Sequence, residues 1–201
     1  MSTTQYFSIA NSHFEYHSGW LNSELCQEYF KDIHQNIHWS QDSIRIFGKS
    51  HPIPRLNAWM SNDAIPYQYS NIQLQSQAIP RSIKAIQDEL NHQFACKFNS
   101  VLLNLYRNGA DSMGWHCDDE VLFEANASIA SISLGASRDF VIRNRQNPKE
   151  QIKIPLHNGD LFIMHAPAQQ ETQHSLPKRA TVIEARINLT FRSIRSNYRK
   201  S

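Results

Sequence analysis

The spacing of hydrophobic residues predicts two helices in the first half of the chain. In residues 21–33, and again in residues 79–94, apolar side chains recur every three or four positions, which places them on one face of a helix. Asn22 or Ser23 can cap the first helix, and Pro80 suits the first turn of the second. We therefore expect two amphipathic helices, each with one buried face.

The rest of the chain predicts strands. Residues 43–74 are rich in proline, aromatic and polar residues, which predicts short strands and loops with little regular core. From residue 101 onward, short apolar runs are separated by turn-forming pairs such as Asn108-Gly109 and Asn158-Gly159. This arrangement is typical of a sandwich or a jelly roll. The expected strands span residues 101–106, 128–134, 139–143, 151–156, 160–164 and 180–192.

Composition and charge fit a globular protein. With 201 residues, 40% of them hydrophobic and 19% charged, the chain is long enough for one domain with a substantial core. A net charge of +2 is weak evidence for nucleic-acid binding. Three cysteines without metal-type spacing favour a reducing compartment, and no apolar run is long enough to span a bilayer. We expect a monomer without a membrane partner, in the cytoplasm or, in a eukaryote, the nucleus.

Three residues form a candidate metal site. His116 and Asp118 stand two positions apart, so on a strand they face the same side, and His174 can join them from another strand or loop. Two imidazoles and one carboxylate suit ferrous iron with open coordination positions. Three protein ligands also suit a catalytic zinc ion, so the pattern alone leaves the metal open.

A segment after this candidate site carries two arginines on one face. In residues 186–192, apolar residues alternate with Arg186, Asn188, Thr190 and Arg192. A buried guanidinium needs an anionic partner, and it binds a carboxylate through two parallel hydrogen bonds. Two such groups suit the two ends of 2-oxoglutarate. Together with the candidate metal site, they indicate an oxygen-activating enzyme with a dicarboxylate co-substrate.

Asn104 and Tyr106, two positions apart on the preceding expected strand, can bind the same co-substrate or form an ordinary interior polar pair. Together, these motifs resemble those of the AlkB family of iron- and 2-oxoglutarate-dependent dioxygenases, which reverse alkylation damage on nucleic-acid bases. The resemblance covers about residues 44–192, and its most specific part is the final run, 186–192. It is carried by Phe47-Gly48-Lys49, Pro54-Arg55, Tyr67-Gln68-Tyr69-Ser70, Asn104-Leu105-Tyr106, His116-Cys117-Asp118-Asp119-Glu120, Ser133-Leu134-Gly135, Arg138-Asp139-Phe140, Gly159-Asp160-Leu161, His174-Ser175-Leu176-Pro177 and Arg186 to Arg192.

The resemblance implies a fold and a division of the chain. The fold would be mainly β (α+β): a double-stranded β-helix, or jelly roll, with supporting N-terminal helices and a nucleotide-recognition lid. One dioxygenase domain would comprise the helices and lid at about 1–95, the jelly-roll catalytic core at about 96–192, and a basic tail at 193–201.

The resemblance also implies which residues bind what. His116, Asp118 and His174 would hold Fe(II). The residues expected around 2-oxoglutarate are Asn104, Tyr106, Arg186, Asn188, Thr190 and Arg192, with the far carboxylate on Arg192 and the near one beside Arg186. The residues expected to meet the nucleic acid are Phe47, Gly48, Lys49, Arg55, Tyr67, Gln68, Tyr69, Asp119 and Glu120.

Several of the lid residues have ordinary alternatives. Tyr67 and Tyr69 would contact or stack on the damaged base, or else pack in the core of a short strand. Asp119 and Glu120 would meet the polar edge of a cationic base, or else lie in a solvated loop. Phe47, at a hairpin tip, is either a wedge that enters the base stack or a buried residue beside a turn glycine.

The implied activity is oxidative demethylation of bases such as N1-methyladenine and N3-methylcytosine in alkylated DNA or RNA. It would use Fe(II), O2 and 2-oxoglutarate and release formaldehyde, succinate and CO2. A methylated Watson–Crick nitrogen is inaccessible inside a duplex, so the base must be flipped out or single-stranded. The same chemistry on a protein, or a non-catalytic jelly-roll module that binds alkylated nucleic acid, are alternatives. Thr172 and residues 164–167 depart from the usual family pattern, which bears on the pocket near His174.

Overall fold

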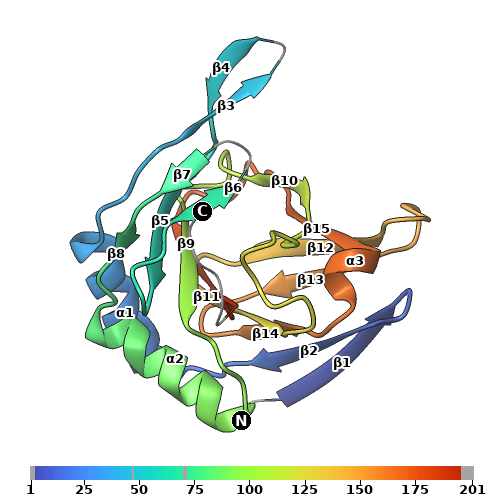
Figure 1. Cartoon of the computed structure of the whole chain (residues 1–201), viewed down its shortest axis with the longest axis horizontal. Coiled ribbons are helices and arrows are strands. Elements are labelled where there is room, and N and C mark those ends of the chain that lie inside the picture. The colour runs from blue at the N-terminus through green and yellow to red at the C-terminus, as the bar shows by residue number, and fades with distance from the viewer. Residues whose placement is uncertain (1–2, 47, 70–71, 196–201) are drawn as a thin grey trace.

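Two facing β-sheets dominate the computed structural model, which describes residues 3–46, 48–69 and 72–195 (Figure 1). The larger sheet contains, in order, β1 (Thr3–Ile9), β2 (Ser12–Ser18), β14 (Leu161–Met164), β11 (Ile129–Gly135), β16 (Arg186–Arg192), β9 (Ser100–Tyr106), β5 (Leu56–Ser61) and β8 (Ser76–Gln77). The smaller sheet contains, in order, β10 (Met113–His116), β15 (Thr172–Leu176), β12 (Arg138–Asn144) and β13 (Gln151–Leu156). Two hairpins form separate two-stranded sheets: β3 (Ser43–Ile46) with β4 (Lys49–Pro52), and β6 (Tyr67–Tyr69) with β7 (Ile72–Leu74). This arrangement confirms the predicted mainly β jelly roll.

Two helices, α1 (Ser23–Asn36) and α2 (Arg81–Gln93), cover the outer face of the larger sheet (Figure 1). Both were predicted. Asn22 caps α1 by accepting a hydrogen bond from the Leu25 N–H at 2.9 Å. Pro80 stands at the N-cap of α2 rather than within its first turn, and no side chain caps that helix. Neither these helices nor any other among the described residues combines the length and apolar character needed to cross a membrane.

Alternate residues of β16 face two environments, the hydrophobic core and a cavity. Its apolar residues pack into the core between the larger sheet and the helices: Ile187, Leu189 and Phe191. Its polar residues lie on the opposite face and line a cavity between the two sheets: Arg186, Asn188, Thr190 and Arg192. The prediction that both arginines point inward is confirmed, because successive residues of a strand face opposite sides.

The strands predicted after residue 100 are confirmed to within one residue at each end, with one exception. The last strand begins at Arg186 rather than at residue 180. Residues 180–185 form a loop whose backbone lies against Gly109: the Gly109 N–H donates to the Val182 carbonyl at 2.7 Å. A Cβ atom on Gly109 would lie 1.7 Å from the Arg179 carbonyl oxygen, so this close approach requires glycine.

Other parts of the sheets were not anticipated. The expectation of little regular core in residues 43–74 is wrong for β5, which pairs with β9 and is almost completely buried at Trp59 and Met60. The β1–β2 hairpin and the short strands β10 and β15 were not predicted. β10 is only four residues long and partly exposed, so it carries too little alternation to be recognised from sequence.

Candidate metal centre and co-substrate cavity

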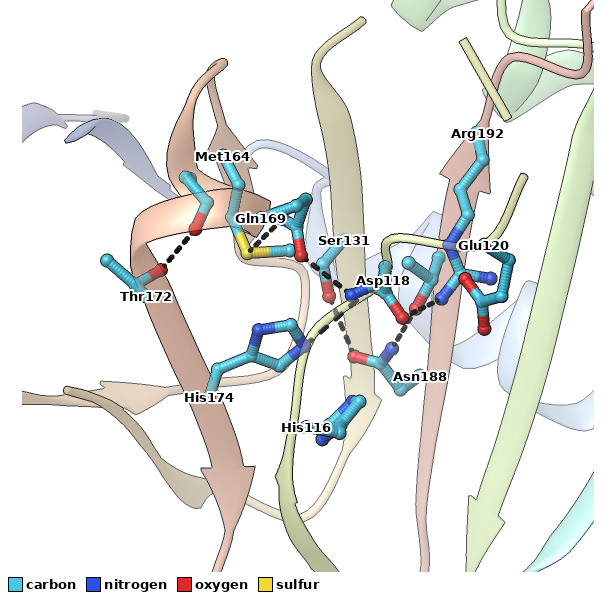
Figure 2. Close-up of polar contacts among 12 residues, drawn as sticks. His116, Asp118, Glu120, Ser131, Met164, Gln169, Thr172, His174, Asn188 and Arg192 are labelled. Carbon is cyan, nitrogen blue, oxygen red and sulfur yellow. Dashed lines mark hydrogen bonds and ion pairs between the residues drawn. The ribbon is translucent and has the colours of Figure 1, made fainter. Parts of the chain in front are cut away.

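Two neighbouring strands of the smaller sheet and the segment that follows β10 bring the three candidate ligands together (Figure 2). His116 at the end of β10 and His174 in β15 are cross-strand partners, and their ring centroids are 4.1 Å apart. Oδ2 of Asp118 lies 3.7 Å from Nε2 of His174. One nitrogen or oxygen atom from each of the three lies within 4.8 Å of the others, which is close enough for all three to bind one ion. The predicted triad is therefore assembled.

One detail of the prediction is wrong. We expected His116 and Asp118 to point the same way from adjacent pleats of one strand. β10 ends at His116, and Asp118 lies beyond it in an irregular segment. Asp118 is nevertheless 7% exposed, because its carboxylate turns back toward the two histidines.

The protonation states of the three residues fit a divalent metal. Burial lowers the pKa of His116 and brings the pKa of His174 to about 3, so both imidazoles are neutral at pH 7. Burial alone would raise the pKa of Asp118, but Arg192, His174 and His116 together hold it below its usual range. Nδ1 of His116 donates to the Gly114 carbonyl at 2.9 Å, which leaves Nε2 available for a metal.

A cavity of about 510 Å³ opens beside the triad. All six residues expected around a dicarboxylate line it: Asn104, Tyr106, Arg186, Asn188, Thr190 and Arg192. It is therefore in this cavity that a co-substrate can lie next to the metal.

Arg192 occupies the end of the cavity nearest the triad. Its Nη2 donates to Oδ1 of Asp118 at 2.7 Å. Its Nε and Nη1 are buried and have no hydrogen-bond partner in the described part of the chain. Burial opposes its charge, but Asp118, Tyr67 and Glu120 raise its pKa above the ordinary value, so it stays a cation.

Arg186 lies at the other end of β16, against neutral groups. Its Nη2 donates to Oγ of Ser133 at 2.8 Å and to Oδ1 of Asn188 at 2.9 Å, and its guanidinium lies 5.6 Å from the centre of the Tyr106 ring. Burial lowers its pKa to about 10, which still leaves it charged at pH 7. Among the described residues no carboxylate pairs with it, so this buried cation lacks a counter-ion.

A chain of hydrogen bonds joins the polar residues of β16 to β11. Asn188 accepts from Oγ of Ser131 at 2.9 Å and donates to Oγ1 of Thr190 at 2.7 Å. Asn188 and Thr190 are thus already engaged by protein groups and hold the cavity wall in shape. Sequence reasoning missed Ser131 and the role of Ser133, although their alternation with apolar residues in β11 is the same signal that identified the arginines.

Glu120 and Tyr67 also line the cavity. The Tyr67 hydroxyl donates to Oε1 of Glu120, and the Tyr67 ring stacks on Trp59 with centroids 4.6 Å apart. Tyr67 is 2% exposed, so its ring packs in the core as well as lining the cavity. Oε2 of Glu120 is buried without a partner among the described residues, and burial raises the pKa of this carboxyl group.

Of the other residues expected to contact the nucleic acid, only some line the cavity. Arg55 is buried and lines the cavity, where its Nε donates to Oδ1 of Asn104 at 3.1 Å. Asp119 is exposed and also lines the cavity. Three exposed residues lie away from the cavity. Gln68 is in the β6–β7 hairpin. Gly48 and Lys49 are on the β3–β4 hairpin, which projects from the body of the protein (Figure 1). Phe47 and the Tyr69 side chain lie outside the described residues.

Comparisons with known proteins agree with this geometry. The sequence pattern of the 2OG-Fe(II) oxygenase superfamily matches residues 13–192. Human alpha-ketoglutarate-dependent dioxygenase alkB homolog 3 is 34% identical over 184 residues, which are 87% of this chain and 61% of that protein. Human DNA oxidative demethylase ALKBH2 is 33% identical over 177 residues, 83% of this chain and 68% of that protein. The chain thus spans about three fifths to two thirds of the length of these curated relatives.

A solved structure entitled "The structure of OsALKBH1" superimposes with a TM-score of 0.67, covering 95% of this chain and all of the other, at 16% identity. This similarity supports the fold alone. The superfamily match over most of the chain, the identity to ALKBH2 and the assembled triad together show that the chain belongs to the 2OG-Fe(II) oxygenase superfamily and, within it, to the AlkB homologues.

Proposed function

We propose that this protein is a dioxygenase that removes methyl groups from alkylated bases of DNA. One observation carries the proposal: the metal triad opens onto a cavity that holds two buried arginines and a carboxylate oxygen of Glu120 that has no partner among the described residues. The arginines suit a dicarboxylate, and the Glu120 oxygen suits a cationic or hydrogen-bond-donating ligand. A cavity with both features accommodates the co-substrate and the damaged base side by side.

The contacts of the two arginines suggest which end of 2-oxoglutarate each one binds. Arg192 donates a hydrogen bond to the metal ligand Asp118. Its Nε and Nη1, which have no partner among the residues that the structure describes, therefore suit the carboxylate next to the metal. Arg186 lies by Tyr106 and Ser133, and no carboxylate in the described part of the chain pairs with it, which suits the far carboxylate. This assignment is the reverse of the one expected from sequence, where nothing distinguished the two arginines.

The residues present fit Fe(II), since neutral imidazoles and an ionised carboxylate are the forms that bind it. When bound, Fe(II) with O2 and 2-oxoglutarate supplies the oxidation that places a hydroxyl group on the N-methyl carbon. The C–N bond then breaks, its electron pair returns to the ring nitrogen, the hydroxyl proton is released, and formaldehyde leaves. One base, one formaldehyde, one succinate and one CO2 result for each O2 and 2-oxoglutarate consumed.

Glu120 is proposed to recognise the damaged base. N1-methyladenine and N3-methylcytosine are cations, and a buried carboxylate stabilises a cation over its neutral, repaired form. Tyr67 would fix the orientation of this carboxylate through its hydroxyl group, and its own contact with the base stays a prediction. Because Asp118 and His174 are buried, a methyl group reaches the metal site only on a base that has left the helix. We propose that Lys49, on the projecting hairpin, contacts a backbone phosphate and that Phe47 enters the base stack.

The name of the human relative ALKBH2, a DNA oxidative demethylase, favours DNA as the substrate. The test is a panel of matched oligonucleotides carrying N1-methyladenine or N3-methylcytosine, in single- and double-stranded DNA and in RNA, with a methylated peptide as a further arm. We expect formaldehyde from the DNA arms. Release from the RNA or peptide arm only would overturn the substrate assignment, and tight binding of alkylated DNA without succinate would favour a non-catalytic module.

A further inference from the structure

The segment that carries Asp118 leaves the sheet before it reaches that residue. β10 ends at His116, so the backbone N–H of Asp118 has no strand partner. It donates instead to Oε1 of Gln169 at 2.8 Å (Figure 2). Because Asp118 is buried, a backbone N–H at this position needs a partner within the protein, and a side chain from another part of the chain supplies it.

The amide of Gln169 is held in one orientation. An N–H can only donate, so the oxygen of the amide must face Asp118. The other end of the amide, Nε2, donates to the sulfur of Met164 at 3.6 Å (Figure 2). Met164 is 3% exposed and lines the cavity. Gln169 therefore connects the metal-ligand segment to the cavity wall.

The helix that carries Gln169 is firmly anchored. α3 (Ala168–Glu171) is a single helical turn. Oγ1 of Thr172 donates to the Ala168 carbonyl at 2.7 Å, and the Glu171 carbonyl accepts from the Arg145 N–H at 2.9 Å. The Glu171 carboxylate accepts from the backbone and side-chain N–H groups of Asn11 at 2.8 and 3.0 Å. These contacts tie α3 to the β12–β13 turn and to the β1–β2 turn, so it is a fixed support.

We propose that Gln169 is a positioning residue for the metal centre. It fixes the backbone at Asp118 so that Oδ2 faces His174 while Oδ1 stays on Arg192. It touches neither the metal nor the substrate and acts only through Asp118. The inference rests on the proposed metal-binding role of the triad. Gln169 lies between residues 164–167 and Thr172, the two places where the sequence departs from the usual family pattern.

The test measures Mn(II) binding by calorimetry, with Mn(II) as a redox-stable stand-in for Fe(II). Gln169→Met keeps the length of the side chain and removes the acceptor, and we expect about tenfold weaker binding, within the range for residues that orient metal ligands. Gln169→Glu keeps an oxygen at the same place, and we expect binding at least as tight as in the wild type. Gln170→Met is the matched control, because Gln170 lies on the same helix and donates to the Ala125 carbonyl instead.

Equal Mn(II) affinity of Gln169→Met and Gln170→Met would overturn the inference. So would an equal loss in Gln169→Met and Gln169→Glu, because that result would mean that the acceptor oxygen is not what matters. If Gln169→Met does not fold, Gln169→Asn removes the same contact with a smaller change and takes its place. Failure of the wild type to bind Mn(II) would overturn the metal site itself, and binding without demethylation would overturn only the proposed reaction.

Discussion

Arg192 and Asp118 form a buried ion pair in which Nη2 donates to Oδ1 at 2.7 Å, and each is almost completely enclosed. The pair uses one oxygen of a metal ligand and one nitrogen of a guanidinium. It leaves Oδ2 beside His174, and Nε and Nη1 of Arg192 have no partner within residues 3–46, 48–69 and 72–195. One contact therefore links the metal site to the site for an anionic co-substrate.

Replacing Arg192 should damage both sites at once. Arg192→Met removes one partner of a buried charge pair, and such losses cost about 2–5 kcal/mol. We expect 2-oxoglutarate to bind the Mn(II)-loaded variant at least about 30-fold more weakly in calorimetry. Arg179→Met removes an exposed arginine paired with Asp139 and should leave the affinity unchanged. An Arg192→Met affinity within about threefold of the wild type would contradict this account.

Replacing Arg186 should affect only the far end of the co-substrate. Arg186→Met should weaken the binding of 2-oxoglutarate strongly but leave the binding of 2-oxobutyrate, which lacks the far carboxylate, nearly unchanged. Arg192→Met should weaken both ligands. Competition measurements with the two oxo acids check this. The opposite pattern would restore the assignment expected from sequence, with the far carboxylate on Arg192.

Tyr67→Phe should impair base recognition without disturbing the metal site. The substitution keeps the ring that packs on Trp59 and removes the hydroxyl that donates to Glu120. Because the freed carboxylate would lose one hydrogen bond, we expect kcat/KM for a methylated oligonucleotide to fall about tenfold, which corresponds to about 1.4 kcal/mol. Mn(II) affinity should stay constant. Gln73→Ala, at an exposed position of the same hairpin, is the control, and an equal effect from both variants would argue against a role for the hydroxyl.

Asp111 predicts an acid-sensitive contribution to stability. Burial alone would raise its pKa, but three hydrogen bonds from Arg107 at 2.8–2.9 Å hold the pKa below its usual range. A lowered folded-state pKa stabilises the protein above the unfolded value of about 3.9, and this contribution is lost as pH falls through the folded value. Asp111→Asn should therefore cost about 1–3 kcal/mol at pH 7. The difference from the wild type in urea unfolding should shrink below about pH 4, and a difference that stays constant down to pH 2 would exclude this origin.

The sequence predicted the parts of the site that depend on residue type and local periodicity. His116, Asp118 and His174 were identified by ligand chemistry, and the inward arginines by the alternation of residues 186–192. Ser131 and Ser133 follow the same alternation and were within reach of the same reasoning.

The other features of the site depend on contacts between distant segments, which local sequence patterns do not encode. Arg186 and Arg192 look equivalent along β16, and only the hydrogen bond to Asp118 distinguishes their ends of the cavity. Gln169 shows no signal in its own neighbourhood, since its partner lies 51 residues away. Trp59, whose ring stacks on Tyr67, lies in a segment whose apolar run was too short to indicate a buried strand.

Formaldehyde release tests the central claim most directly. The wild type and Asp118→Ala are each incubated with Fe(II), 2-oxoglutarate, O2 and single-stranded DNA containing N1-methyladenine, and binding of the same oligonucleotide is measured in parallel. The account predicts equal amounts of formaldehyde and succinate from the wild type and neither from Asp118→Ala, although both bind the DNA. Formaldehyde release by Asp118→Ala at the wild-type rate, or none by the wild type with its metal site filled, would contradict it.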